Sequence, residues 1–475
     1  MIIKKLFEYK NISEKSNILL DEINKSFKNK IVVRYCRELS KDISIPEKEI
    51  IFYFKKKIFN SFNIKKNKFT KKLSLFSIIK YIFSYVFFII TIFLCKKNNK
   101  KKSLKKYDLL IDDVHSIKEL KRYKNLRSYF KKSSVAVKIN EKLKYENKFY
   151  NIFYRKNFFN YEVKIKDLLF LIKLFYKNII YSYNTKINFY YLSIVLINDY
   201  YYFSSMFNDY KFKYVLSSRH YVTNNIKNYI LKKRNTKTCV IQKNIDSENI
   251  NGFFLSSDIL FVLGNKTKIK KKRFCNIKEQ FPVGSFYMET IFYDKKVKKD
   301  KIIESFDILC LGGNEQYPGG EFDNDNDHVK NYIEHLNWLK KISHDFPKLK
   351  VGFKHHDNNK NNFEEIFFKN TNVVYIKKNI NSYDLCYKAK FLCSWASTMI
   401  IESFSINKKG FFLDPNYKNV QYMKNINKNI RINTYNKFKK IFFNNSNKKK
   451  INLKNYCVNS KNTSHRIFNY LINRY

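Results

Sequence analysis

The sequence predicts an α/β protein with two doubly wound domains of the Rossmann type, preceded by a helical region. Three observations support this prediction. Short apolar runs alternate with amphipathic segments along most of the chain, the charged run Lys295–Asp300 interrupts the alternation, and all 9 glycines lie between Gly252 and Gly410. Strands that alternate with helices predict a parallel sheet, and a chain of 475 residues is long enough for two such sheets.

Residues 1–105 are predicted to form a basic, helical region that contacts a membrane. Within it, Leu73–Cys95 runs for about 23 residues with one charge, Lys80, and is long enough to cross a hydrocarbon core of roughly 30 Å. Lysines flank this segment on both sides, so the charge rule assigns no orientation. A helix lying in the membrane interface and a helix buried in the first domain are the alternatives.

The first domain is expected at 106–296, and it begins with the apolar run Tyr107–Asp113, which is typical of a strand. Its further predicted strands are Val135–Ile139, Tyr214–Ser218, Thr238–Gln242 and Ile259–Gly264. Its predicted helices are Ser116–Phe130, Lys166–Tyr183, Ile187–Phe207 with a break near Asp199, and Tyr221–Lys233.

The second domain is expected at 300–430, where strands and helices alternate at closer spacing. Its five predicted strands are Phe306–Leu311, Lys350–Lys354, Val373–Ile376, Phe391–Ser394 and Gly410–Leu413. Its predicted helices are Asp327–His344, Tyr383–Ala389 and Thr398–Ile406. The remaining residues, 431–475, are expected to form a helical tail that packs back on the first domain.

The charge balance is strongly basic, with 94 Lys and Arg against 40 Asp and Glu. Such a field attracts phosphates, but 83 of the basic residues are Lys, spread along the chain without a dense block. Nucleic-acid recognition favours arginine forks and clustered basic surfaces, so no nucleic-acid partner is expected.

Cysteine usage and the start of the chain indicate a cytoplasmic protein. The 8 cysteines form no CxxC pair, which argues against a zinc module or a disulfide framework and fits a reducing cytosol. Met1–Leu20 carries charges throughout and has no continuous apolar core, so no secretory signal is expected.

The segment Phe391–Pro415 is the most informative for function. An apolar strand ends at Ser394, small and hydroxylated residues follow, and a helix is predicted from Thr398. Free amide groups at the start of a helix stabilise an anion, and the hydroxyls of Ser397 and Thr398 add donors, so this turn is a candidate phosphate site. Glu402, one helical turn later, is a candidate acceptor for ribose hydroxyls. Ordinary helix capping by Ser and Thr is the alternative.

Three motifs in this segment form a recognisable signature: Ser394-x-x-Ser397-Thr398-x-x-x-Glu402, Lys409-Gly410 and Leu413-Asp414-Pro415. The signature resembles the donor domain of GT-B glycosyltransferases of bacterial surface polysaccharide biosynthesis, which build capsules and lipopolysaccharides. It is similar also to the polysialyltransferase and glycerophosphotransferase relatives of that group. The resemblance implies two Rossmann-type domains that face a cleft, with the activated-sugar donor bound to the second domain and the acceptor to the first.

In that group, a strand that ends in K-x-HP contacts the donor phosphate or nucleotide. The matching stretch here is Lys354-His355-His356-Asp357, which lacks the proline. The resemblance implies a donor contact for His355, with His356 as the alternative.

The resemblance covers about 200 residues and includes three motifs in the first domain: Val240-Ile241-Gln242, Asp258–Gly264 and Pro282–Ser285. Many relatives continue the first of these motifs as QHG, whereas Lys243 and Asn244 follow here. Lys243 is a candidate residue of the interdomain cleft.

The loop after the first strand of the second domain is rich in glycine. Gly312 and Gly313 open it and Gly319 and Gly320 follow, which permits a ligand to approach the backbone closely. In the resembling enzymes this loop lines the cleft, and a plain flexible loop is the alternative.

Acidic residues follow this glycine-rich loop and imitate part of a calcium loop: Asp323, Asp325, Asp327 and Glu334. His328 stands where a calcium loop requires glycine, and acidic residues are common before a helix. GT-B enzymes generally need no metal, so neither a metal nor a cofactor is expected, and the nucleotide-activated sugar is a substrate.

Candidates for a general base lie where the first strand of the first domain ends: Asp112, Asp113 and His115. Open α/β sheets bind ligands beyond the carboxyl ends of their strands, and a carboxylate or imidazole there can accept the proton of an attacking hydroxyl. A cap between strand and helix is the alternative. Arg219 is a candidate for binding an anionic acceptor or the donor phosphate, unless it only starts a helix.

The residues and the resemblance together imply a metal-independent glycosyltransferase that acts at the cytoplasmic face of the membrane. It would transfer a sugar, or a related group, from a nucleotide-activated donor to a glycan or lipid-linked acceptor. The alternative is a catalytically inactive GT-B protein that scaffolds a polysaccharide assembly complex, which the altered Gln242-Lys243-Asn244 run supports. A lysine-driven nucleic-acid binder is the third class, and it predicts an affinity that falls steeply with salt.

Overall fold

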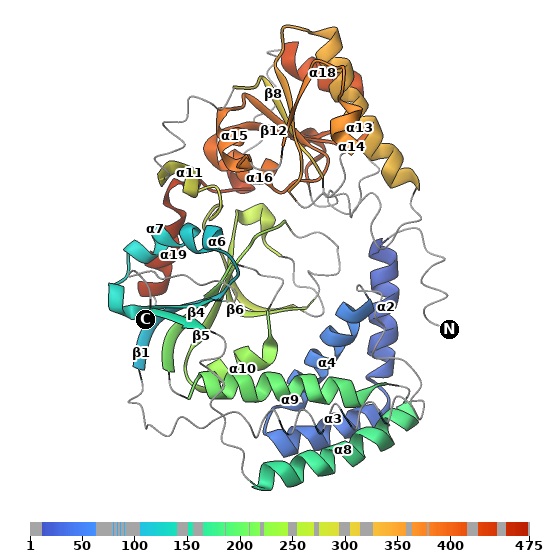
Figure 1. Cartoon of the computed structure of the whole chain (residues 1–475), viewed down its shortest axis with the longest axis vertical. Coiled ribbons are helices and arrows are strands. Elements are labelled where there is room, and N and C mark those ends of the chain that lie inside the picture. The colour runs from blue at the N-terminus through green and yellow to red at the C-terminus, as the bar shows by residue number, and fades with distance from the viewer. Residues whose placement is uncertain are drawn as a thin grey trace.

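The computed structural model describes most of the chain and shows two separate parallel sheets, each flanked by helices (Figure 1). The described residues are 12–62, 79, 83, 86, 90, 105–139, 151–154, 165–185, 187–208, 210–218, 223–245, 254–269, 275–293, 305–313, 326–357, 363–377, 380–415, 426–443 and 453–473. The predicted boundary at Lys295–Asp300 lies outside them.

The first sheet has seven parallel strands in the order β3-β2-β1-β4-β5-β6-β7. The strands are β1 (Lys105–Val114), β2 (Val135–Ile139), β3 (Asn151–Tyr154), β4 (Tyr210–Ser217), β5 (Lys237–Ile241), β6 (Leu255–Val262) and β7 (Cys275–Pro282). The chain winds outward from β1 in both directions, so the predicted doubly wound topology is confirmed. The sequence patterns do not predict β3 and β7, which are the two edge strands.

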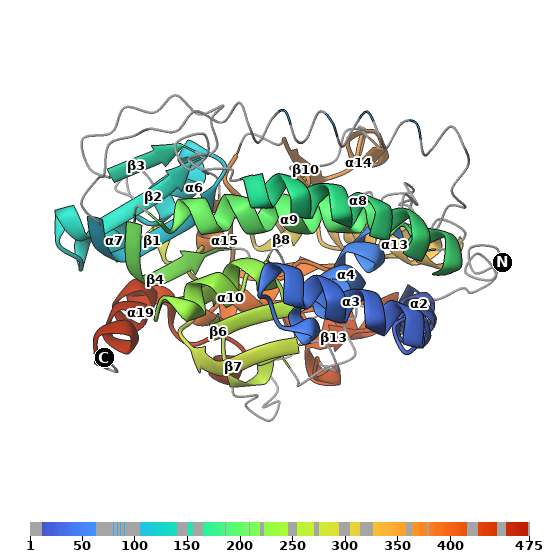
Figure 2. The same cartoon turned by 90° about the horizontal axis from the view of Figure 1, so that it is seen from below.

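Alternate residues of β1 face the two helical layers that cover this sheet. Leu110 packs on one side with α8 (Ile165–Thr185), α9 (Phe189–Met206) and α10 (Asn225–Lys233). Leu109 and Ile111 pack on the other side, beneath α6 (Ile117–Arg122) and α7 (Lys124–Ser128). Figure 2 shows the layer of α8, α9 and α10 from below.

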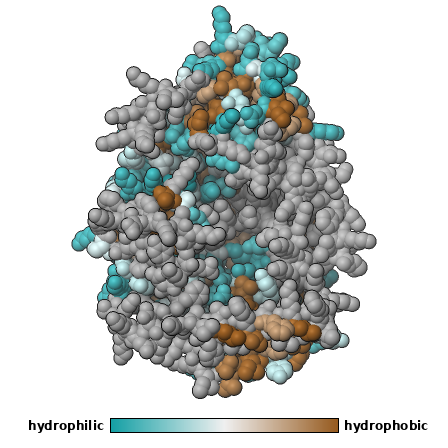
Figure 3. Space-filling model, viewed as in Figure 1, coloured by the Kyte–Doolittle hydropathy of each residue, from teal (hydrophilic) through white to brown (hydrophobic). Residues whose placement is uncertain are grey.

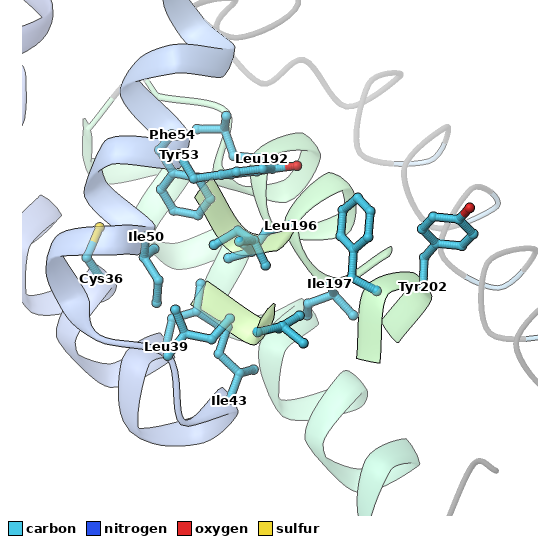
Figure 4. Packing of buried hydrophobic residues seen from close by; sticks show 14 of the residues in the cluster. Cys36, Leu39, Ile43, Ile50, Tyr53, Phe54, Leu192, Leu196, Ile197 and Tyr202 are labelled. Carbon is cyan, nitrogen blue, oxygen red and sulfur yellow. The ribbon is translucent and has the colours of Figure 1, made fainter. Parts of the chain in front are cut away.

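Three helices that open the chain belong to this first domain: α2 (Ile12–Ser26), α3 (Lys30–Ile43) and α4 (Glu47–Phe62). In Figure 4, Leu39, Ile43 and Ile50 of α3 and α4 pack toward Leu196 and Ile197 of α9. These five side chains are buried. The prediction of helices at the start of the chain is confirmed, and the described helices form a layer of the first domain's core.

The predicted break of α9 near Asp199 is wrong, because the helix runs through this residue. Asp199 accepts hydrogen bonds from the Tyr53 hydroxyl at 2.5 Å and from Asn224 Nδ2 at 2.9 Å. The carboxylate therefore fastens α9 to α4 and to the start of α10.

Most of the predicted membrane segment, Leu73–Cys95, lies outside the described residues. Its four described residues, Ile79, Phe83, Val86 and Ile90, are helical, and all four side chains are exposed. Among the described parts of the chain, no helix is both long enough and apolar enough to cross a membrane.

The second sheet has six parallel strands in the order β10-β9-β8-β11-β12-β13. They are β8 (Ile308–Leu311), β9 (Val351–Lys354), β10 (Val373–Ile376), β11 (Phe391–Ser394), β12 (Lys409–Leu413) and β13 (Arg431–Ile432). Its helices include α13 (Asn326–Asp345), α14 (Phe363–Phe367), α15 (Ser382–Lys388), α16 (Met399–Ser403) and α18 (Tyr435–Phe443). The five predicted strands are present, and the short edge strand β13 adds a sixth.

The chain leaves the first domain after the short helix α11 (Thr290–Tyr293), and after the second domain it returns to the first with the late helix α19 (Thr463–Ile472). The Tyr214 hydroxyl donates to Leu471 O at 2.5 Å. A Cβ at Gly264 would lie 2.5 Å from Asn455 O, and Gly284 has a φ of +92°. These two glycines therefore admit the returning backbone of the chain itself, not a ligand.

Candidate active site

The two sheets face each other through their carboxyl-terminal edges (Figure 1). Tyr287, after β7, donates its hydroxyl to Ser218 O beyond β4 at 3.1 Å, and its ring stacks on Tyr383 of α15 at 6.4 Å between centroids. Ser285 Oγ donates to Glu402 of α16 at 2.6 Å. We call the contacts of Ser285, Tyr287, Tyr383 and Glu402 the interdomain seam. Open α/β sheets bind their ligands at such edges.

The predicted donor residues meet at one edge of the second sheet. Its order reverses between β8 and β11, and this switch point is where a doubly wound sheet binds its ligand. Gly312 and Gly313 follow β8, Thr398 comes shortly after β11, and His355 follows β9, which neighbours β8. Because strands lie about 4.8 Å apart, the ends of β9 and β11 are separated by about 10 Å.

His355 is buried at the end of β9 with only 1% of its side chain exposed. Its Nδ1 lies 3.3 Å from Glu364 Oε2 on α14, and its ring meets Tyr375 edge-on at 5.7 Å between centroids. Within the described chain, its Nε2 has no hydrogen-bond partner. A buried imidazole nitrogen without a partner is unusual, and it is available to a ligand atom.

Glu364, whose Oε2 lies beside His355, is itself held in place by a hydrogen bond to its other oxygen. Its Oε1 accepts the Tyr332 hydroxyl at 2.8 Å, and both Glu364 and Tyr332 are buried. The Tyr332 ring in turn packs edge-on against Trp395, which directly follows β11. A Cβ at Gly313 would lie 3.3 Å from the Tyr332 ring, so Gly313 is in contact with this group. Helices α13 and α14 and the residues after β8 and β11 thus pack together beside His355.

His356, the alternative to His355, is half-buried in the turn after β9. Burial lowers its pKa from the ordinary value and favours the neutral imidazole. Lys354 is buried, and its Nζ donates to His355 O at 2.7 Å and to Asp357 at 3.0 Å. The lysine thus fixes the backbone of this turn.

In the predicted phosphate turn, backbone N–H groups donate hydrogen bonds to serine hydroxyls of the same turn. Ser394 Oγ accepts the N–H groups of Ala396 at 3.3 Å and Ser397 at 3.0 Å, and Ser397 Oγ accepts the N–H of Met399 at 3.3 Å. Helix α16 has only 5 residues, so its dipole is small. The Thr398 side chain makes no capping hydrogen bond and is half-exposed, which leaves its hydroxyl as the donor that the turn offers.

Glu402 does not face open solvent, because only 2% of it is exposed. Its two oxygens accept from Ser285 Oγ at 2.6 Å and from the Tyr383 hydroxyl at 3.2 Å. Burial raises its pKa from 4.5 to about 7, although both hydrogen bonds and the charges of Arg122 and Lys243 oppose the rise. In this arrangement a ribose hydroxyl would have to displace Ser285 or Tyr383.

The seam continues into the first domain beside the switch point between β1 and β4. Arg122 of α6 lies over the Tyr287 ring at 4.5 Å. Glu119 accepts the Ser218 hydroxyl at 2.8 Å and the His115 N–H at 2.9 Å, so it ties the end of β4 to the end of β1. His115 itself is exposed at this switch point, which suits a base that receives a proton from a bound acceptor.

Asp112, by contrast, is enclosed in the sheet with 1% exposure. Its carboxylate is 2.5 Å from Lys138 Nζ and 2.6 Å from Lys227 Nζ. Burial would raise its pKa, but the two ammonium groups prevail and hold it below the ordinary value. A carboxylate of such low basicity is a poor proton acceptor, so the geometry favours His115 over Asp112 as the base.

Several predicted residues remain without a structural test. The side chain of Asp113 and all of Arg219, Gly319 and Gly320 lie outside the described residues. Lys243 is half-buried and close enough to Glu402 for its charge to lower that group's pKa. The described side chains contain no group of three or more His, Cys, Asp or Glu that could hold a metal ion.

Sequence reasoning misses the residues that support the site: Glu119, Arg122, Ser285, Tyr287, Tyr332, Glu364 and Tyr383. Ser285 lies within the PVGS motif, which marks its position but not its contact with Glu402. Tyr332 and Glu364 come from separate helices and meet only through packing. No local spacing in one sequence indicates such a contact.

Glu402 gives the first pH-dependent prediction. A group whose pKa is raised on folding contributes stability that is present below its unfolded pKa and lost as pH rises through the folded value. The difference between 4.5 and about 7 corresponds to about 3 kcal/mol in a fully buried carboxyl. We therefore expect Tm to fall between pH 5 and pH 8, and Glu402→Gln, which does not titrate, to remove part of this fall. Glu365→Gln, at an exposed position of α14, is the control, and an unchanged slope in Glu402→Gln would contradict the assignment.

The two facing, doubly wound parallel sheets define the class of fold, which is the two-domain α/β arrangement that the sequence motifs imply. No model of a protein family matches the sequence, and no curated protein matches it either.

Solved structures are similar to the chain at low identity. A UDP-GlcNAc 2-epimerase from Methanocaldococcus jannaschii has 13% identity over 77% of this chain and 99% of its own, with a TM-score of 0.43. One from Neisseria meningitidis, bound to UDP-GlcNAc, has 12% identity over 78% and 100%, with a TM-score of 0.43. A variant of the wall teichoic acid polymerase TagF with CDPG has 10% identity over 85% and 98%, with a TM-score of 0.42.

Proposed function

We propose that the chain is a metal-independent glycosyltransferase that moves a sugar, or a related group, from a nucleotide-activated donor to a surface polysaccharide acceptor. The observation that carries the proposal is the buried His355 at the carboxyl-terminal edge of the second sheet, with Nε2 unpaired within the described chain. An imidazole fixed there can donate a hydrogen bond to a phosphate oxygen as the nucleotide leaves. The polysialyltransferase and glycerophosphotransferase group remains part of the proposal.

The opposing edge of the first sheet supplies the acceptor side. His115 is exposed at that switch point and is the proposed base, while Arg122 and Lys243 add positive charge near the seam. The reaction is proposed to take place at the cytoplasmic face of the cell membrane, where lipid-linked glycans are extended. Metal independence is part of the proposal, because His355 and the basic side chains would neutralise the leaving phosphate.

An inactive scaffold is the second candidate. The observation that favours it is that the phosphate turn and Glu402 satisfy their hydrogen bonds within the chain. A scaffold predicts no hydrolysis of any donor, even where a nucleotide binds.

The test is a calorimetric and thermal-shift screen of UDP-, GDP-, CMP- and CDP-linked sugars with the full chain, followed by assays of donor hydrolysis. A nucleotide at 100 times its Kd should add about 2.7 kcal/mol to the free energy of unfolding. Stabilisation with slow hydrolysis supports the transferase. Stabilisation without hydrolysis supports the scaffold, and no stabilisation by any nucleotide removes the transferase.

Thr398 provides a residue-level prediction for the cognate nucleotide. Thr398→Ala removes the one hydroxyl of the turn that makes no capping bond, and a hydrogen bond to a charged group is worth roughly 1.5–3 kcal/mol. Calorimetry should therefore show an affinity about ten- to a hundredfold lower. Ser128→Ala, which removes an exposed hydroxyl from the first domain, should bind as wild type. Wild-type affinity in Thr398→Ala would take this hydroxyl out of the site.

A further inference from the structure

An exposed apolar stripe runs along α8, on the side of the first domain far from the second sheet. Its five members recur at helical spacing and are between 44% and 80% exposed: Leu169, Ile172, Tyr176, Ile180 and Tyr183. At 100° per residue they fall within about 80° of the helix circumference. In the view of Figure 3, a hydrophobic patch lies at the bottom of the molecule, where α8 lies in Figure 1.

The opposite face of α8 is fixed to the protein, so the stripe is held in place. Leu171 and Leu174 are buried in the first domain's core. Asn178 accepts the Tyr35 hydroxyl of α3 at 2.5 Å and donates to Ser193 Oγ of α9 at 2.7 Å. A solvent-facing row of five large apolar side chains on a rigid helix is unusual for a surface that stays in water.

The exposed charges that α8 itself carries beside the stripe are positive. Lys166 and Lys173 are exposed along one flank of it. The neighbouring carboxylates Glu38 and Asp42 are both paired with Lys177, at 3.0 Å and 3.2 Å. The stripe therefore presents apolar side chains with lysines along one flank and no exposed carboxylate of α8.

We propose that this face of α8 docks on a membrane surface that contains anionic lipid, with the helix lying in the plane of the interface. Aliphatic side chains would enter the acyl boundary, lysines would meet phosphate headgroups, and Tyr176 and Tyr183 suit the interface with an apolar ring and a polar hydroxyl. A second copy of the chain is a poorer occupant, because it carries the same formal net charge of +54.

This docking does not depend on nucleotide chemistry, and it differs from the predicted contact through Leu73–Cys95. It would orient the molecule with the first domain on the lipid surface and the second domain away from it. The seam would then lie above the membrane, at a fixed height set by the first domain.

The test is co-sedimentation of the full chain with vesicles of phosphatidylcholine alone and of phosphatidylcholine with phosphatidylglycerol. Replacing both Leu169 and Ile180 by Glu alters only exposed positions, and it should lower affinity for the mixed vesicles more than about tenfold. Replacing Lys166 and Lys173 by Glu should lower that affinity several-fold and leave binding to neutral vesicles unchanged. The matched control is Ile366→Glu, which places the same charge on an equally exposed apolar site of α14.

Wild-type binding to mixed vesicles by the Leu169 and Ile180 double variant, with an unchanged Tm, would overturn the proposal. Loss of a concentration-dependent dimer in that variant, without loss of vesicle binding, would assign the stripe to a second copy and overturn it as well. A lower Tm with unchanged vesicle binding would assign the stripe to contact with another segment of the same chain, which also overturns it.

Discussion

Asp112→Asn is expected to lower the free energy of unfolding by about 3–5 kcal/mol, because it leaves Lys138 and Lys227 buried without their shared counter-charge. The three side chains are each less than 10% exposed, so water cannot replace the lost carboxylate. Denaturant unfolding would measure the change. A catalytic base at this position would instead give a stable protein with lost turnover.

The control for this variant is Asp108→Asn on the same strand, where the carboxylate is exposed and the change should be within about 0.5 kcal/mol. Because the pKa of Asp112 is lowered on folding, its contribution is present above the unfolded value near 3.8 and is lost as pH falls further. Wild-type stability in Asp112→Asn would refute the buried ion-pair account.

His355→Ala is expected to reduce turnover by about a hundredfold or more while changing nucleotide affinity less. The imidazole would act on the charge that develops as the nucleotide leaves, and such interactions are stronger in the transition state than in the ground state. Steady-state kinetics with the donor that the screen identifies would separate kcat from binding. His344→Ala, on the exposed face of α13, is the control.

A second variant, Glu364→Gln, tests whether Glu364 positions His355. The variant keeps the shape of the side chain but replaces the carboxylate that lies 3.3 Å from His355 Nδ1. A positioning role predicts a smaller loss of turnover than in His355→Ala, with a shifted pH profile. Equal nucleotide affinity and equal turnover in His355→Ala and wild type would remove His355 from the mechanism.

The central strands of both sheets could be predicted from the sequence, and the edge strands mostly could not. The inner strands β2 and β11 begin and end at the predicted residues, and so does β10, which is the exception among the described edge strands. Central strands are buried on both faces and therefore form continuous apolar runs. β7 is an edge strand whose residues Lys278, Glu279 and Gln280 face outward or lie half-exposed, and β13 has only 2 residues, so neither shows a strand pattern.

The candidate site also contains some residues whose position could be predicted from the sequence and others whose position could not. Gly312, His355 and Thr398 could be placed at one sheet edge because strand order along a doubly wound sheet follows from the rhythm of strands and helices. The burial of Glu402 could not be predicted, because its partner Ser285 lies 117 residues earlier in the chain. The charge partners of Asp112 are also distant in sequence, because Lys138 lies 26 residues later and Lys227 lies 115 residues later, and only the assembled sheet brings them together.

The packing of α19 against the first domain has a consequence for synthesis on the ribosome. Ile467, Tyr470 and Leu471 complete the hydrophobic cluster beneath α6 and α7, yet they are translated only after the whole second domain. The first domain therefore emerges with this side of its sheet only partly covered, by α6 and α7, and stays so while about 180 further residues are made. A nascent chain of this kind offers an apolar surface to chaperones until its last helix arrives.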